Sequence, residues 1–370
     1  MNRTVVKASM LSIWFAATLG AVLLAQRTAT PARTSPAETS AQITAAAQAV
    51  LSSLDEAGRA KVQFPAGSAQ KTKWSNLPSP MYQRFGIRLG DLTAPQRAAV
   101  MKLLTVALSA EGYRKVQEIM EGDEVLRKNP AAGAPPGGGR GPGGPPPGGG
   151  RGPGGPGGGG GPAFGADNYY LSFVGAPSAT TPWILQYGGH HLAINLAIGG
   201  SQATMTPSLP AAQPATFAVE GRTVRPLGDE NDKAFALINA LDEKQRSQAI
   251  IGSRVVDLVL GPGADGKTIQ PEGVRGSALT AAQQTMLWDI VHEWVGISAD
   301  AYSEPRMTEI KSHLNDTYFA WSGPITNGSA AYFRIQGPTL VIEYSPQGSV
   351  DHIHTIYRDP TNDYGAKFTK

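Results

Sequence analysis

Two short stretches, Leu92-Thr-Ala-Pro-Gln96 and Leu279-Thr-Ala-Ala-Gln283, carry most of the information about how this chain folds. In each, a threonine is followed three residues later by a glutamine, which is the pattern of a capping box at the start of a helix. The earlier stretch also has a proline in what would be the first helical turn, where a helix tolerates it. We therefore predict that a helix begins at each stretch.

The same two stretches are part of a longer internal match. They lie 187 positions apart, and at the same offset Leu51-Ser-Ser-Leu54-Asp-Glu56 matches Ile238-Asn-Ala-Leu241-Asp-Glu243. Further along, at an offset of 148, Tyr170–Gly175 matches Tyr318–Gly323. We expect an α+β fold in which two related helix-helix-strand-strand halves, produced by an internal duplication, pack as one domain.

The expected organisation places a single duplicated domain at residues 40–368. Repeat one covers about residues 41–200, repeat two about 228–345, and a C-terminal strand and turn 350–368. The high glycine and proline content of the chain, 45 and 29 residues, comes largely from one segment. Residues 131–165 contain 19 glycines and 9 prolines, and we expect them to be a disordered Gly/Pro-rich insert. The insert is either a tolerated insertion without function or an interaction tether.

The N-terminus has the pattern of a secretory signal peptide. Arg3 and Lys7 precede an uncharged apolar run from Ala8 to Ala25. We expect a signal peptide at residues 1–25, a linker at 26–39 and an exported protein, periplasmic or extracellular, with no membrane association after cleavage. An uncleaved membrane anchor is the alternative. The chain has no cysteine, which excludes disulfides and thiolate metal sites.

The charge argues against a nucleic-acid-binding protein. The formal net charge is only +3, and no dense Lys/Arg patch with interleaved aromatic residues is present. We expect no nucleic-acid partner, and a small-molecule or polymer substrate instead. The sequence does not indicate an oligomeric state.

Four of the six histidines lie in two short clusters, His190-His191 and His352-Ile-His354. In a strand, alternate residues face the same side, so His352 and His354 should project together. His190 and His191, in a strand, should face opposite sides. Such imidazoles suit Zn, Cu, Fe or Mn, and one ordinary alternative is that they are hydrogen-bonded structural residues.

The internal match adds further candidates to these histidines. Asn195 aligns with Glu343, and both lie on expected strands next to a histidine segment. We therefore predict a metal site formed by His190, His191, Glu343, His352 and His354. Asn195, Arg334 and Arg358 are predicted to support the ligands or contact substrate, although an ordinary salt bridge also accounts for the two arginines.

Two functions of different classes follow from these patterns. In the first, the chain is an exported metal-binding protein and, more specifically, a metal-dependent enzyme that uses a His/Glu site. The second is a non-catalytic binding or structural module of the cell envelope that binds no metal. The sequence does not identify a reaction or a substrate.

Several long segments resemble a known family. They are Phe173–Ser178, Gly189–Leu192, Tyr332–Glu343 and His352–Gly365. Together they are similar to the domain-of-unknown-function family 3500, and the resemblance covers about residues 40 to 368. It implies a single family-length domain and directs attention to the histidine segments, and it implies no activity.

Overall fold

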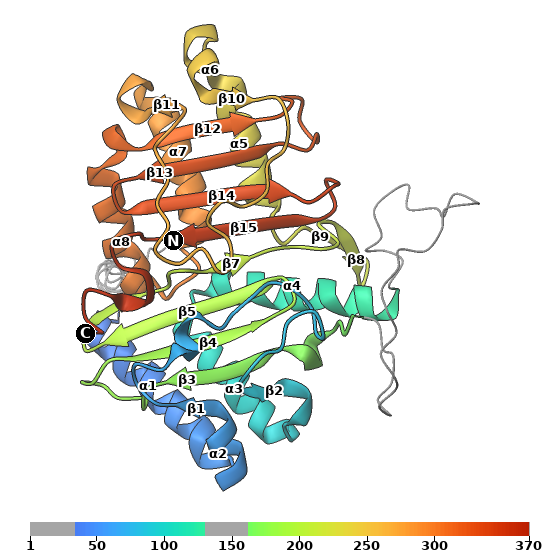
Figure 1. Ribbon diagram of the computed structural model, residues 1–370, viewed down its shortest axis with the longest axis vertical. Helices are drawn as coiled ribbons and strands as arrows, with labels where there is room; N and C mark the ends of the chain where they lie inside the picture. Colours follow the sequence, from blue (N-terminus) through green and yellow to red (C-terminus); the bar gives the residue numbers. More distant parts are fainter. Residues whose placement is uncertain (1–33, 130–161, 370) are drawn as a thin grey trace, which may run out of the picture. The chain divides into compact units, whose positions relative to one another are not determined.

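The computed structural model describes residues 34–129 and 162–369, which form a mixed α+β structure (Figure 1). Its helices are α1 (Pro36–Ser53), α2 (Glu56–Val62), α3 (Ala94–Ala107), α4 (Ala110–Lys128), α5 (Gly228–Ala240), α6 (Glu243–Ala249), α7 (Ala281–Val295) and α8 (Asp300–Ser312). One sheet contains β1 (Gln63–Phe64), β2 (Ile87–Arg88), β3 (Tyr170–Val174), β4 (Trp183–Gly189), β5 (Leu192–Gly199), β6 (Gln202–Thr204) and β7 (Leu209–Pro210). The other contains β10 (Ile250–Gly252), β11 (Val274–Arg275), β12 (Tyr318–Ser322), β13 (Tyr332–Gly337), β14 (Leu340–Pro346) and β15 (Ile353–Arg358), and β8 (Phe217–Val219) pairs with β9 (Arg222–Val224).

The predicted helix starts are confirmed. Helix α3 begins after a capping box of Thr93 and Gln96, and α7 begins after one of Thr280 and Gln283. In both, the glutamine side chain accepts a hydrogen bond from the backbone N–H of the threonine, which satisfies a donor that the first helical turn leaves free.

The two sheets have the same pairing pattern. In the first, β1 pairs parallel with β3, β2 pairs antiparallel with β3, and β3, β4 and β5 form a meander. In the second, β10 pairs parallel with β12, β11 pairs antiparallel with β12, and β12, β13 and β14 form the meander. The helices also occur in the same order before the strands, so each half reads helix-helix, two short strands, helix-helix, and three long strands.

A short segment joins the two sheets. Strand β7 pairs antiparallel with β5 through Leu209 and Pro210, and the residues around it bridge to β15 at Ser208↔Tyr357 and Ala212↔Ile353. Figure 1 accordingly shows β5, β7 and β15 side by side. Because the antiparallel segment lies between them, β5 and β15 run in the same direction and their first residues lie at the same edge.

Each sheet has its own hydrophobic core. In the first half, α1, α3 and α4 contribute Ile43, Val50, Leu103, Leu104 and Ile119 to a cluster with strand residues that include Phe173 and Leu185. In the second half, α5, α7 and α8 contribute Phe235, Leu287, Trp294 and Met307 to a cluster with Trp321, Phe333 and Tyr344. Burial of these apolar side chains is the main source of stability in a chain without disulfides.

Ser35–Lys370 form one compact unit. The predicted signal peptide (1–25), residues 26–33 of the predicted linker and residues 131–161 of the predicted insert lie outside the described residues. Two boundaries differ from those expected. Helix α1 begins at Pro36, inside the expected linker, because Ser35 and Glu38 form a capping box there. The expected insert extended to Gly165, whereas Ala163 already bridges to Ser79. No helix in the described part of the chain has the length and apolar character needed to cross a bilayer.

Candidate metal centre

His352 and His354 project together from the start of β15. His354 is the second residue of the strand and His352 precedes its first, so the two side chains fall on one face. Ile353 between them exchanges two backbone hydrogen bonds with Ala212 of the joining segment, each 2.9 Å long. The prediction that these two imidazoles lie side by side is confirmed.

His191 reaches the same place from a turn. His190 and His191 connect β4 to β5, and His191 has φ of 62°, a left-handed conformation that is uncommon for a residue with a side chain. Its backbone N–H donates to the carbonyl of Asn76, and its carbonyl accepts from Ala211. The turn is therefore held from both sides in a strained conformation, a feature that is frequent at functional sites.

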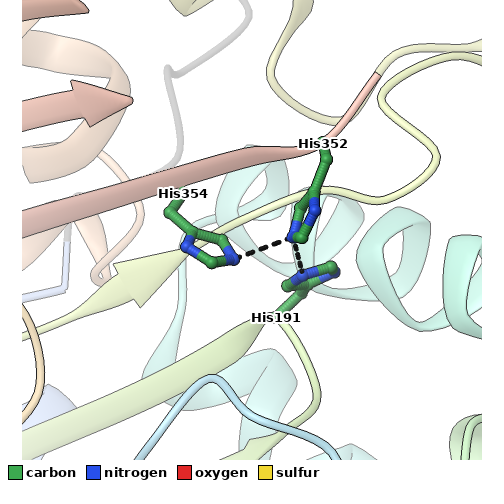
Figure 2. Close-up of side chains that lie close together, drawn as sticks. All are labelled: His191, His352 and His354. Atoms are coloured by element: carbon green, nitrogen blue, oxygen red, sulfur yellow. Dashed lines mark hydrogen bonds between the residues drawn. The ribbon is translucent and has the colours of Figure 1, made fainter. Parts of the chain in front are cut away.

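The three imidazoles converge on one point, as Figure 2 shows. Nε2 of His352 lies 3.0 Å from Nε2 of His191 and 2.9 Å from Nε2 of His354. One ligand nitrogen from each ring lies within 4.8 Å of the other two. Nitrogens bound at about 2.1 Å to one ion lie about 3.0–3.4 Å from one another, so the two distances from Nε2 of His352 are close to those of a metal site.

The environment keeps these rings neutral. Burial, together with the neighbouring His190, lowers the pKa of His352 from 6.5 to about 4. Burial and the two neighbouring histidines His352 and His190 lower the pKa of His354 to about 3. Burial also places the pKa of His191 well below its usual value, with the other histidines adding to the effect. At neutral pH all three therefore carry a free lone pair, which metal binding requires.

His190, predicted as a ligand, is not a member of this group. Its Nδ1 lies 2.6 Å from a carboxylate oxygen of Asp123 on α4, and its ring lies against that of His191 with centroids 3.6 Å apart. The expectation that His190 and His191 face opposite sides is also wrong, because they form a turn and not a strand. His190 supports the ring of His191 from the side of α4.

Glu343, the predicted carboxylate ligand, is also not a member of the group. It is fully buried in β14, and both of its oxygens have other partners. Oε1 accepts hydrogen bonds from the backbone N–H of Val259 and the hydroxyl of Tyr332, and Oε2 accepts from the backbone N–H of Leu260. The carboxylate therefore anchors the segment that follows β10 to the sheet.

The alignment of Asn195 with Glu343 has a structural counterpart. Asn195 pairs with Gln186 in the first sheet, and Glu343 pairs with Arg334 at the corresponding position of the second. Corresponding positions of two sheets are separate places, which explains why the alignment did not bring the two residues together. The amide of Asn195 accepts from Gln186 and donates to the carbonyl of Pro207.

Arg334 and Arg358 form ion pairs within the second half. Arg334 donates to Glu272 at 2.8 Å, and Arg358 donates to Asp265 at 3.0 Å and to Asp363 at 2.8 Å. None of these contacts includes a histidine. The salt-bridge alternative thus describes both arginines.

Two residues at the centre were not predicted from the sequence. The amide nitrogen of Asn76 lies 3.1 Å from Nε2 of His354, and the carbonyl of the same residue holds the His191 turn. Asp123 orients His190. Asn76 lies in an irregular loop and Asp123 on a helix far away in the sequence, and no sequence pattern marks either one.

Comparison with known proteins gives a family and no activity. A family model described as "Protein of unknown function (DUF3500)" matches residues 36–366, which confirms the resemblance seen in the sequence. No curated protein and no solved structure matches the chain.

Proposed function

The chain belongs to the DUF3500 family, whose description carries no activity, and we propose from its site that it binds one transition-metal ion through Nε2 of His191, His352 and His354. The observation that carries this proposal is that Nε2 of His352 lies within 3.0 Å of Nε2 of both His191 and His354, with one ligand nitrogen of each ring within 4.8 Å of the others. With Nδ1 protonated in each ring, all three Nε2 atoms present lone pairs, which repel each other unless a cation lies between them. In the hydrogen-bonded alternative, Nε2–H of one ring donates to a neighbouring ring and no cation is needed.

The donor set suits Zn, Cu, Fe or Mn, which imidazole ligands bind well. Within residues 34–129 and 162–369, the three histidines form the group without a fourth His, Cys, Asp or Glu. A metal with three protein ligands retains a position for water or substrate, as catalytic sites do, whereas structural sites are usually closed by four ligands. We therefore propose further that the protein is a metal-dependent enzyme, in which the ion held by the three histidines would supply an activated water or an open coordination position.

The first experiment measures metal content. Protein purified without a histidine tag and reconstituted with Zn, Cu, Fe or Mn is expected to hold one ion per chain by elemental analysis. The double variant His352→Ala, His354→Ala should hold none. The matched control is His292→Ala, His313→Ala, which removes the two histidines outside both clusters and should retain the ion. Equal metal content in the two double variants would refute the site, and the non-catalytic module would then be the better assignment.

A second experiment addresses the open position. Cobalt substituted into the site should give a visible spectrum that changes when azide is added, because azide can occupy only a position that the protein leaves free. A spectrum that azide does not alter would indicate a closed, structural site and would argue against catalysis.

Export remains part of the proposal. It is supported by the basic residues Arg3 and Lys7 before the apolar run that ends at Ala25. The mass of the protein recovered from its own cells should correspond to a chain that begins just after Ala25. A full-length chain in the membrane fraction would instead support the uncleaved anchor.

Internal duplication is proposed for the two halves. It is supported by the matched sequence segments together with the identical pairing patterns of β1–β5 and β10–β14. Under this proposal β15 corresponds to the short strand β6, which pairs antiparallel with β5 as β15 does with β14. Strand β6 contains no histidine, so the metal ligands do not repeat.

A further inference from the structure

A groove runs along the first sheet, apart from the three ligand histidines. It consists of two adjoining hollows that share Arg84, Phe85 and Tyr170. The hollow beside Lys61 has a volume of about 400 Å³, which is in the range of small-molecule sites. The hollow beside Lys73 and Trp74 has a volume of only about 30 Å³, room for about one or two water molecules. One wall is the segment between β1 and β2, drawn in blue in Figure 1, which is tied to the sheet by a hydrogen bond from Gln186 to the carbonyl of Lys71.

Arg84 lies at the junction of the two hollows. Its Nη2 donates to the carbonyls of Ser75, Leu77 and Gly189 at 2.8, 2.6 and 2.6 Å. Its Nε and Nη1 donate no hydrogen bond to any of the described residues, and its Cζ lies 5.7 Å from the centre of the Tyr82 ring. The guanidinium is thus fixed in place by neutral groups, and two of its nitrogens remain available to a ligand.

The positive charge of Arg84 is offset only in part, by the more distant carboxylate of Asp123, which itself contacts His190. Among the residues that the structure covers, it forms no ion pair with a carboxylate. Lys61 and Lys73 line the same groove, are exposed, and have no carboxylate partner in the described ranges. The one acidic side chain of the lining, Asp91, is paired with Arg88 at 3.1 Å. The groove therefore carries an excess of about three positive charges, which favours an anion.

The groove also offers apolar surface. Phe85 is 46% exposed, an unusual exposure for a phenylalanine, and Tyr170 beside it is partly exposed. Phe64 and Trp74 complete the lining with further ring surface. A ligand that carries an aromatic or apolar body would cover Phe85 while its anionic group faces Arg84.

We propose that this groove binds a small organic acid with one carboxylate and an aromatic body. The carboxylate receives charge-assisted hydrogen bonds from the free nitrogens of Arg84, and Lys61 and Lys73 add to its attraction. The ring packs against Phe85 and Tyr170. A purely inorganic anion would use the charge and leave the exposed ring uncovered.

The groove adjoins the metal centre without sharing its ligands. Arg84 holds the carbonyl of Gly189, the residue before the His190-His191 turn, and Ser75 and Leu77 flank Asn76. The proposal does not require a bound metal. It is therefore tested on metal-free protein, and its outcome is independent of the metal content measured above.

The probe is benzoate, with benzamide as its neutral counterpart, titrated into the full chain by isothermal calorimetry and ligand-observed NMR. Benzoate should bind, and benzamide should bind at least tenfold more weakly. The double variant Lys61→Gln, Lys73→Gln should weaken benzoate binding about three- to tenfold, since each exposed charge contributes modestly. Lys102→Gln, an exposed lysine on α3 outside the groove, should not change it.

Arg84→Lys keeps the charge and loses the guanidinium geometry, so it should also weaken benzoate binding. Thermal unfolding of this variant tests whether it is folded. The double lysine variant does not depend on that check, because its side chains have no structural partners. No binding of benzoate at millimolar concentration, equal binding of benzamide, or unchanged affinity in the double variant would overturn the proposal. Inorganic phosphate binding as tightly as benzoate would overturn the assignment of an aromatic acid.

Discussion

Replacement of Glu343 by glutamine separates the two roles that this residue can have. If Glu343 is a metal ligand, its replacement lowers the metal content of the protein. If Glu343 is a buried anchor, its replacement lowers the stability of the protein. The structure assigns the second role, since its carboxylate accepts from Val259, Leu260 and Tyr332 at 2.8–2.9 Å. We expect Glu343→Gln to destabilise the protein and to leave the metal content unchanged.

The size of the effect follows from these contacts. The amide oxygen of glutamine can replace one carboxylate oxygen, and its NH2 group then faces a donor, so at least one hydrogen bond to a charged group is lost. Such a bond contributes about 1.5–3 kcal/mol, and we expect a loss of about 2–3 kcal/mol. The unfolding entropy of about 330 residues is about 0.7 kcal/mol/K, so Tm should fall by about 3–4 °C.

Urea and thermal denaturation of the wild type and the variant measure this loss, and elemental analysis of the same samples measures the metal. Glu121→Gln is the control, because Glu121 forms only an exposed ion pair with Arg222 and should cost less than about 1 kcal/mol. Unchanged stability combined with lost metal in Glu343→Gln would refute the reasoning and return Glu343 to the site.

Three further predictions concern buried charge and backbone strain. Lys115 is buried between Glu230 and Glu293. Lys115→Met leaves the buried Glu230 without a cation, whereas Glu293 keeps its ion pair with Lys233, and the variant should lose about 3–5 kcal/mol of stability in urea unfolding. An unchanged urea midpoint would contradict this prediction. Burial, opposed in part by Lys115, raises the pKa of Glu230 from 4.5 to about 7, so the native state holds a proton that the unfolded state releases. Stability should therefore fall as pH rises from 4.5 to 7, and wild type should lose stability relative to Glu230→Gln between pH 5 and 8, whereas parallel pH curves would contradict the shift. His191→Gly and His191→Ala both remove the ligand, but glycine tolerates the left-handed backbone conformation at this position. The glycine variant should therefore be about 1 kcal/mol more stable than the alanine variant. Equal free energies of unfolding for the two variants would contradict this prediction.

Much of the fold could be predicted because its signals are local. The capping boxes at Thr93 and Thr280 are formed by residues three positions apart, and the structure begins α3 and α7 there. The matched segments Tyr170–Gly175 and Tyr318–Gly323 contain β3 and β12, and the strand expected within residues 350–368 is β15. The turn at His190 and His191 was missed, because two histidines are not a usual turn sequence and only the left-handed φ of His191 reveals it.

The candidate site was predicted in part for a similar reason. His352 and His354 are two residues apart in one strand, so their common face follows from strand geometry alone. Their meeting with His191 depends on residues 208–212, which place the first residues of β5 and β15 at one edge. Glu343 failed as a ligand because sequence alignment relates equivalent positions of the two sheets and does not indicate which positions touch.

The sequence by itself determined the helix starts, the strands, the α+β class and the pair of histidines on β15, because each depends on contacts within a few residues along the chain. Only the tertiary structure decided which histidine joins that pair, that His190 contacts Asp123, and that Arg84 lies in a groove without an ion-pair partner among the described residues. These outcomes depend on pairings between segments more than 60 residues apart, as with His190 and Asp123 and with His191 and His352. Such pairings are set by the packing of whole sheets and helices, and no local pattern of residues records them.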